Sequence, residues 1–407
     1  MFTLGPRSLR SGDVAVFRPF SAAYLADPYP FLARLREKDP VFKSQDFGAW
    51  VVTRHADCLR ILTDDDRFSS DPVTSRTGMG AVVSHMRAEA PLGNVAILGS
   101  CDPPDHTRIR AEVNAAFTPR QIREFEPEIE GMARDLVQRL PAGRPFDVVS
   151  QLAEPFAVIS ILAYIGVQPE HLDGVRSLAH PIMTARSTEN PSPELLAAAA
   201  GAHAQFADYL QHAPGHRGVI AVLMEAVAKE RITLDEVIML IIHITTAGNG
   251  PAAFAVGNLL MALAAHPDQY AMVRADPALA PQAVEEMLRW DSPVQLINRF
   301  VRVPHEFEGK KFRAGESVFA VVGSANRDAA VFDDPDRFDI TRAPGRLLSF
   351  GQGIHFCLGA PLARLELAIL LRTFAARFGT IEVLPPGPKR APDLLIRGAR
   401  QLAVRAG

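Results

Sequence analysis

The segment that most constrains this chain is residues 349–366, a loop rich in glycine that leads into an apolar, helix-like stretch. One cysteine, Cys357, stands at the junction, and the glycines that would let the backbone approach its sulfur are Gly351, Gly353 and Gly359. The helix is predicted by apolar residues at helical spacing, namely Leu358, Leu362, Leu365 and Ile369. Pro361 is tolerated in its first turn. The sulfur is therefore predicted to lie at a helix N-terminus, where the dipole lowers the pKa of a thiol.

A lone cysteine is usually a small buried hydrophobic residue, so the residues around Cys357 decide its interpretation. Phe350, Gly353, Cys357 and Gly359 fit the pattern Phe-x-x-Gly-x-x-x-Cys-x-Gly, and the segment closely resembles the haem-thiolate loop of cytochromes P450. The resemblance implies that Cys357 is the axial ligand of the iron in haem b, with Phe350 and Gly359 beside the cofactor. A thiolate in that position favours O–O cleavage.

The resemblance extends over nearly the whole chain. Val52-Thr53-Arg54-His55-Ala56-Asp57 and Arg67-Phe68-Ser69-Ser70 resemble the opening of bacterial members of the family. The resemblance to the family implies a mainly α, triangular P450-like fold with a small β region. Because no composition change marks a boundary, we expect a single domain over residues 1–407.

Composition limits the partners. The 43 basic and 46 acidic residues are dispersed, so attraction to nucleic acid or to an anionic membrane is not expected. Three cysteines are too few for a disulfide framework and favour a reducing, cytoplasmic location. We expect a monomer that binds a small apolar molecule.

Residues 237–265 contain no Asp, Glu, Lys or Arg and are numerous enough to span a bilayer. However, His243 and Gly248-Asn249-Gly250-Pro251 interrupt the stretch. We therefore expect a helix buried in a large core rather than a membrane span. Residues 1–7 show neither the apolar region of a signal peptide nor an anchor.

His106 and Arg110 are four residues apart and share a helix face, which in isolation is typical of a solvated surface. The resemblance to the His-x-x-x-Arg helix of P450s implies instead that both contact the haem propionates, which need cationic, hydrogen-bonding partners. By the same resemblance, Arg299 and His355 are further propionate partners.

Glu286 and Arg289, three residues apart, would ordinarily form a surface pair. They match the Glu-x-x-Arg motif of the family, with Arg337 as the implied third member of a buried ion network that supports the thiolate loop. The resemblance also suggests residues that line the substrate pocket, namely Val294, Leu296, Ile297 and Ile396. Basic residues suggested for partner docking on the thiolate side are Arg108, Arg364 and Arg372.

The sequence departs from the family in the apolar helix, where Ala-Gly-x-Asp/Glu-Thr is usual and Ala247-Gly248-Asn249-Gly250-Pro251 is found. Gly250 replaces the acid and Pro251 the hydroxyl, so neither side chain can relay a proton. Pro251 also has no N–H to donate to the Ala247 carbonyl, so a kink is expected. That carbonyl and the Asn249 amide are candidates for holding a water. Thr245 and Thr246 lie too far upstream to substitute.

Several interpretations of this departure stay open. In the first, the substrate supplies its own hydroxyl, and in the second, the oxidant is peroxide. In the third, the reaction is oxidative coupling, desaturation or nitric oxide reduction. In the fourth, Asn249 and water suffice for ordinary hydroxylation. We predict a haem-thiolate oxidoreductase of the monooxygenase type that oxidises a hydrophobic small molecule in secondary metabolism. Its electrons would come from a separate ferredoxin and ferredoxin reductase. The alternatives are a peroxide-driven or non-hydroxylating P450 and a catalytically silent haem- or ligand-binding protein.

Overall fold

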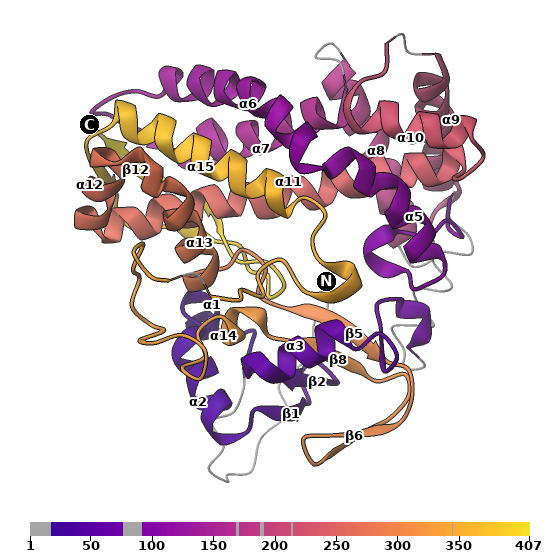
Figure 1. The fold of residues 1–407 in the computed structure, drawn as a ribbon, viewed down its shortest axis with the longest axis horizontal. Coiled ribbons are helices and arrows are strands. Elements are labelled where there is room, and N and C mark those ends of the chain that lie inside the picture. Colours follow the sequence, from indigo (N-terminus) through magenta and orange to yellow (C-terminus); the bar gives the residue numbers. More distant parts are fainter. Residues whose placement is uncertain (1–17, 76–91, 168–170, 188–190, 213–214, 344) are drawn as a thin grey trace.

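The computed structural model describes residues 18–75, 92–167, 171–187, 191–212, 215–343 and 345–407, so the expectation for residues 1–7 lies outside the described residues. Helices predominate and the sheets are small (Figure 1), as the sequence predicted. The α-helices are α1 (Ala22–Ala26), α2 (Tyr29–Lys38), α3 (His55–Thr63), α5 (Asp105–Asn114), α6 (Pro119–Arg139), α7 (Glu154–Ile165), α8 (Leu172–Ser187), α9 (Pro193–His212), α10 (Gly218–Ala228), α11 (Leu234–Ala265), α12 (Pro267–Ala275), α13 (Ala280–Trp290), α14 (Val322–Ala325) and α15 (Ala360–Arg377). Short helical turns are η1 (Pro72–Thr74), η2 (Leu98–Ser100), η3 (Ala115–Phe117), η4 (Val149–Ala153), η6 (Pro277–Leu279) and η7 (Gly353–His355).

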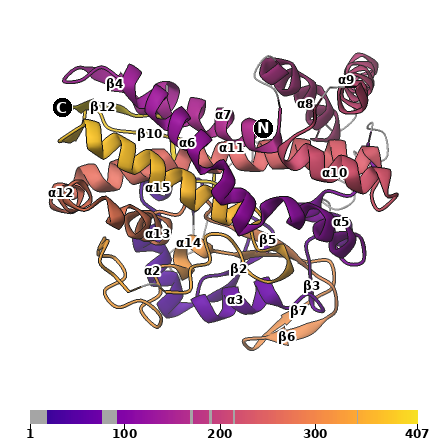
Figure 2. The same ribbon diagram turned by 45° about the horizontal axis from the view of Figure 1, so that its top comes forward.

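The strands are β1 (Val41–Ser44), β2 (Ala49–Val52), β3 (Phe68–Ser69), β4 (Pro145–Asp147), β5 (Ile297–Val301), β6 (His305–Phe307), β7 (Lys310–Phe312), β8 (Ser317–Ala320), β9 (Ile381–Val383), β10 (Lys389–Arg390), β11 (Ala399–Gln401) and β12 (Ala403–Ala406). Within the described residues the largest sheet has the order β1-β2-β8-β5-β3, with β2 and β8 parallel and the other neighbours antiparallel. This sheet, with α2 and α3, lies on the opposite side of the molecule from α6 and α15 (Figure 2). Strand β5, which carries Arg299, lies between β8 and β3 in this sheet.

The long helix α11 begins with a capping box. The Thr233 hydroxyl accepts from the Glu236 amide at 3.1 Å, and the Glu236 carboxylate accepts from the Thr233 amide at 2.8 Å. Pro251 does not interrupt the helix, which continues to Ala265. By length and composition α11 is apolar enough to cross a membrane. Its contacts with α7, α9, α10, α13 and η4 agree with the prediction of a core helix.

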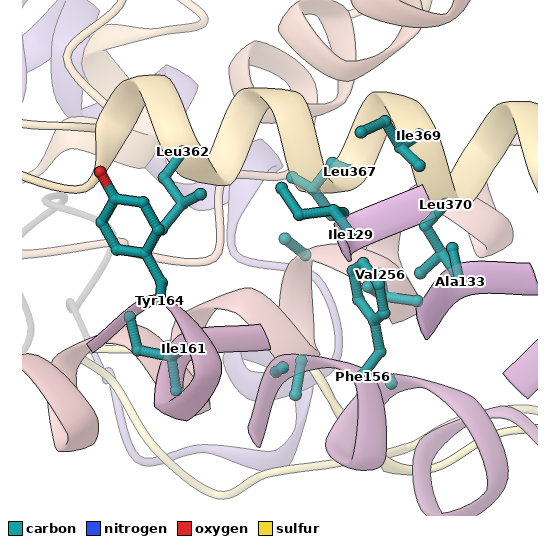
Figure 3. Packing of buried hydrophobic residues seen from close by; sticks show 14 of the residues in the cluster. Ile129, Ala133, Phe156, Ile161, Tyr164, Val256, Leu362, Leu367, Ile369 and Leu370 are labelled. Carbon is teal, nitrogen blue, oxygen red and sulfur yellow. The ribbon is translucent and has the colours of Figure 1, made fainter. Parts of the chain in front are cut away.

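The main core forms where α6, α7, α11 and α15 cross (Figure 3). Tyr164 of α7 points toward Leu362 of α15, Ile161 of α7 points away from α15, and Phe156 lies beside Val256 of α11. All five side chains are at least nine-tenths buried. This packing fixes α15, and with it the residue that precedes α15 in the loop, relative to α11.

A buried ion network joins α13 to the segment before the cysteine loop. Arg289 donates twice to the Glu286 carboxylate, both at 2.8 Å, and their side chains are 1% and 3% exposed. The second guanidinium on Glu286 belongs to Arg342, at 3.3 Å, and not to Arg337. The Arg337 side chain is 65% exposed and pairs with Asp339, and only its backbone carbonyl accepts from Arg289. The expected third member was therefore wrong, because the Arg337 side chain pairs with Asp339 at the surface while Arg342, 14% exposed, contacts Glu286.

The same region is tied to the loop itself by amide and hydroxyl groups. The Asn326 side chain accepts from the Leu348 amide and donates to the Ser349 hydroxyl, each at 2.8 Å. Ser349 in turn donates to the Leu288 carbonyl of α13 at 2.7 Å. Arg289 also donates to the carbonyls of Asn326 and Pro335. The start of the cysteine loop is thus anchored directly on α13.

One carboxyl in the core is not part of any ion pair. Glu366 of α15 is 6% exposed, and its Oε1 has no hydrogen-bond partner within the described part of the chain. Burial raises the pKa of Glu366 from its ordinary value of 4.5 to about 7, although a hydrogen bond with Ser160 opposes the shift. The side chain is therefore largely neutral in mildly acidic solution.

We predict that Arg342→Ala lowers the free energy of unfolding by about 2 kcal/mol, because it removes one partner from a nearly buried pair. Arg337→Ala is the matched control. Its side chain is exposed, so its loss should change stability by less than about 0.5 kcal/mol. Urea denaturation of the two purified variants measures both values, and equal losses would contradict the assignment of Arg342.

We also predict that the free energy of unfolding of Glu366→Gln increases relative to that of the unsubstituted protein as the pH rises. A raised folded-state pKa means that the stability contributed by the neutral carboxyl is present below the unfolded pKa and lost as the pH passes about 7. The difference in free energy of unfolding should grow by roughly 3 kcal/mol between pH 4.5 and pH 8. Denaturation at the two pH values checks this, with exposed Glu382→Gln as the control. A difference that does not change with pH would refute it.

Candidate functional site

Cys357 lies between η7 and α15, as the sequence predicted, and its amide donates to the Phe350 carbonyl at 2.9 Å. This bond closes the loop. Gly351 and Gly353 have φ angles of 69° and 73°, which favour glycine. A Cβ at Gly353 would lie 2.5 Å from the carbonyl oxygen of Leu62, so the loop packs directly on the end of α3. The chain thereby holds one sulfur in a defined place.

The electrostatics of the thiol differ from the expectation of a lowered pKa. Burial raises the pKa of Cys357, although the amides of Gly359 and Ala360 and the charges of Arg110 and Arg364 lower it. The helix N-terminus therefore acts in the predicted direction but is outweighed by desolvation. A metal cation would reverse the balance, because a coordinating thiol is deprotonated.

Four nitrogen-bearing side chains gather beside this loop from three parts of the chain. His106 and Arg110 come from α5, Arg299 from β5 and His355 from η7. The His106 and His355 rings are 4.2 Å apart between centroids. Arg110 donates to the Phe356 carbonyl, next to the cysteine, at 2.8 Å. The structure therefore brings together all four residues predicted to contact propionates.

This cluster holds more positive charge than the described residues neutralise. Burial lowers the pKa of Arg299 to about 10, so the guanidinium stays charged at neutral pH. Burial, followed by the charges of Arg299 and other neighbours, lowers the pKa of His355 to about 3. In the parts of the chain that are described, no carboxylate forms an ion pair with Arg110 or Arg299, and neither ring nitrogen of buried His106 has a hydrogen-bond partner. The cluster fits the two carboxylates of haem b, because buried cations and orphaned donors are costly without partners.

The face of α11 that carries the unusual motif is open. Thr246 and Ala247 are exposed although they lie in the middle of a core helix. A Cβ at Gly250 would meet no atom within 4 Å, whereas one at Gly248 would lie 2.8 Å from Ile161. The Thr245 and Thr246 hydroxyls donate to the carbonyls of Ile241 and Ile242. Neither threonine therefore replaces the missing hydroxyl, as the sequence indicated.

Of the predicted pocket residues, Leu296 is misassigned. It is 7% exposed and belongs to a cluster with Tyr24, Tyr29 and Val51, away from the cysteine loop. Leu296 precedes β5, and its side chain is buried in that separate cluster. Ile297 points the other way, and its Cδ1 would lie 3.5 Å from a Cβ at Gly351. Val294 pairs with Ile396 in an isolated β-bridge, so these two predicted pocket residues lie next to each other.

The arginines suggested for partner docking are already paired with carboxylates. Arg108 pairs with Glu236 at 2.5 Å, Arg364 with Glu285 at 2.5 Å, and Arg372 with Glu126 at 3.6 Å. Their positive charge is thus partly neutralised, which weakens the case for docking. Sequence reasoning also missed the role of η2, whose Leu98 carbonyl forms a hydrogen bond with His355. No motif in residues 98–100 signals that contact.

Comparisons with known proteins agree with this geometry. Residues 203–395 match the family model described as Cytochrome P450. The chain is 34% identical to Cytochrome P450 107B1 of Saccharopolyspora erythraea over 98% of this chain and 100% of the relative. It is 34% identical to Vitamin D(3) 25-hydroxylase of Pseudonocardia autotrophica, over 88% of each chain.

The fold matches a solved structure as well. Cytochrome P450 CYP109Q5 from Chondromyces apiculatus superposes with a TM-score of 0.82 and 32% identity, covering 95% of this chain and 97% of the other. The chain therefore matches members of this family in both sequence and fold over almost its whole length. The chain belongs to the cytochrome P450 family and is a haem-thiolate enzyme of the monooxygenase type.

Proposed function

We propose that this enzyme hydroxylates a hydrophobic small molecule of secondary metabolism, using haem b bound through Cys357. The observation that carries the proposal is the group of His106, Arg110, Arg299 and His355 beside the cysteine loop, where no carboxylate among the described residues forms an ion pair with either arginine. The name of the vitamin D(3) hydroxylase among its relatives supports an apolar substrate. We further propose a cytoplasmic, single-domain monomer that receives electrons from a ferredoxin and its reductase.

Each group has a distinct task in this proposal. Cys357 provides the thiolate, and the hydrogen bonds that close its loop hold the sulfur in place. Arg110 and Arg299 balance the propionate charges, while His106 and His355 donate hydrogen bonds to them. When bound, the haem supplies the activation of dioxygen that hydroxylation requires.

Proton supply on the α11 side is proposed to use the backbone instead of side chains. Pro251 cannot donate to the Ala247 carbonyl, and Ala247 is exposed on the open face of the helix. That carbonyl can therefore accept a hydrogen bond from a water. Asn249 adds a buried Oδ1 without a partner in the described residues. Such a water, or a substrate hydroxyl, takes the place of the usual acid and alcohol.

A peroxide-driven reaction is the second candidate, favoured by Gly250 and Pro251, which offer no proton-relaying side chain. Parallel assays with ferredoxin, its reductase and dioxygen, or with hydrogen peroxide alone, separate the two. Faster product formation with the redox partners supports the monooxygenase, and product only with peroxide supports the alternative.

We predict that Cys357→Ala removes the Soret band that marks a thiolate-ligated ferrous carbon monoxide complex, because it removes the sulfur proposed to bind the iron. Cys58→Ala and Cys101→Ala are matched controls, since both cysteines are free and buried but are not proposed as ligands. Both should keep the band. Its survival in Cys357→Ala would overturn the ligand assignment, and its absence from the unsubstituted, haem-loaded protein would overturn the proposed function.

We predict that Pro251→Ala raises the fraction of reducing equivalents lost as hydrogen peroxide by about threefold, because the new N–H engages the Ala247 carbonyl and excludes the water. Gly250→Ala is the control, since a Cβ there meets no atom within 4 Å. The double variant Gly250→Asp with Pro251→Thr should recover the loss by supplying a side-chain route. Peroxide release measured against reductant consumption checks all three. Unchanged peroxide release in Pro251→Ala would exclude the backbone route.

A further inference from the structure

His243 carries the one ionisable side chain in the apolar stretch 237–265. It precedes Thr246, Ala247 and Gly250 by three, four and seven residues, so it shares their face of α11. Those residues form the open part of the helix, whereas Ile241, Ile242 and Ile244 are buried in the core. The imidazole is therefore placed on the side of α11 that borders the open space.

A second contact places the ring next to the propionate cluster. A Cβ added to Gly99 would lie 2.9 Å from both Cε1 and Nε2 of His243, so the ring edge rests against the backbone of η2. Leu98, the residue before Gly99, accepts a hydrogen bond from His355 through its backbone carbonyl. Turn η2 thus contacts His243 on α11 and His355 of the cysteine loop. Gly99 is needed because any side chain would displace the ring.

Among the residues that the structure describes, the His243 ring has no hydrogen-bond partner. No hydrogen bond joins either nitrogen of His243 to another described residue, whereas the neighbouring Thr245 and Thr246 hydroxyls are both satisfied. Burial lowers the pKa of His243, so the imidazole is neutral at pH 7. A neutral imidazole offers one donor and one acceptor. In an apolar environment it suits an uncharged oxygen better than a carboxylate, which would require a charged partner.

We propose that His243 hydrogen-bonds a hydroxyl or keto oxygen of the substrate, and so orients an otherwise apolar molecule between α11 and η2. This inference rests on the proposed function and narrows it, because it specifies a substrate that carries a neutral oxygen away from the carbon to be oxidised. A single fixed hydrogen bond limits the poses of an apolar ligand, which is how a remote contact selects one position for reaction. His243 is thus a specificity-determining residue.

The test compares two pairs of probes in the haem-loaded protein: cyclododecanone with cyclododecane, and cyclopentadecanone with cyclopentadecane. Dissociation constants come from the shift of the Soret band. In the unsubstituted protein, at least one ketone should bind about tenfold more tightly than its hydrocarbon, the effect of one buried neutral hydrogen bond. His243→Leu should reduce that preference to below about twofold, and His243→Gln should retain part of it.

Two further variants separate recognition from packing. Gly99→Ala keeps the histidine but displaces its ring, and should lose the ketone preference as His243→Leu does. Thr246→Val, whose hydroxyl is bound to its own helix, should leave the preference unchanged. The inference is overturned if neither ketone is preferred by the unsubstituted protein, if His243→Leu keeps the preference, or if it weakens ketone and hydrocarbon equally. The carbon monoxide spectrum of each protein shows whether the proposed haem-thiolate function itself holds.

Discussion

The buried pair between Glu286 and Arg289 organises the side of the molecule that carries the cysteine. Each charge has been taken out of water, and each is satisfied by several groups: Arg289 by the carboxylate and three backbone carbonyls, Glu286 by two guanidinium groups and the Asp339 amide. Such a network contributes little net stability compared with apolar packing, but it tolerates few alternative geometries. The irregular segment between residues 326 and 349 therefore takes a defined path and delivers the loop onto α13 and α3. The position of the sulfur depends on this path.

The neighbouring cluster of His106, Arg110, Arg299 and His355 follows the opposite logic. Here no carboxylate among the described residues forms an ion pair with either arginine, and both ring nitrogens of His106 lack a hydrogen-bond partner there, which is unfavourable in a buried environment. The arrangement makes sense as preorganisation, because the groups are held by separate elements before an anionic cofactor contacts them. Arginine thus serves two purposes in this protein. In the Glu286–Arg289 pair its partner is a carboxylate of the protein, whereas in the cluster beside the cysteine loop the partner is proposed to be a carboxylate of the cofactor.

Helix α11 combines a rigid position with an open surface. Its core faces pack against α7, α13 and η4, while Ala247 and Gly250 leave space on the remaining face. Pro251 removes one helical hydrogen bond without ending the helix, because the surrounding packing maintains the conformation. The Ala247 carbonyl, which position 251 cannot satisfy, and the neutral His243 are then polar groups on this part of the helix. Positions 250 and 251 thus lack the acid and the alcohol that are usual in the family, while α11 remains one continuous helix.

The family, the fold class and the cysteine junction were predictable from sequence, because their signals are local. The glycine spacing before Cys357, the apolar run of α11 and the His106–Arg110 spacing each lie within one element. Arg342 was not predictable, because two arginines five residues apart can each serve as the third member until the contacts of Glu286 are known. The burial of Leu296 was likewise missed, since an apolar residue next to a short strand gives no sign of whether it meets the site or a separate core cluster.

The sequence by itself determined which chemical groups this protein possesses and which usual ones it lacks at positions 250 and 251. The tertiary structure alone decided which of those groups meet, because residues from α5, β5 and η7 are brought together by packing and not by spacing along the chain. It also placed Gly99 against His243 across more than a hundred residues, a contact that depends on the path of the backbone and leaves no periodic trace in the sequence.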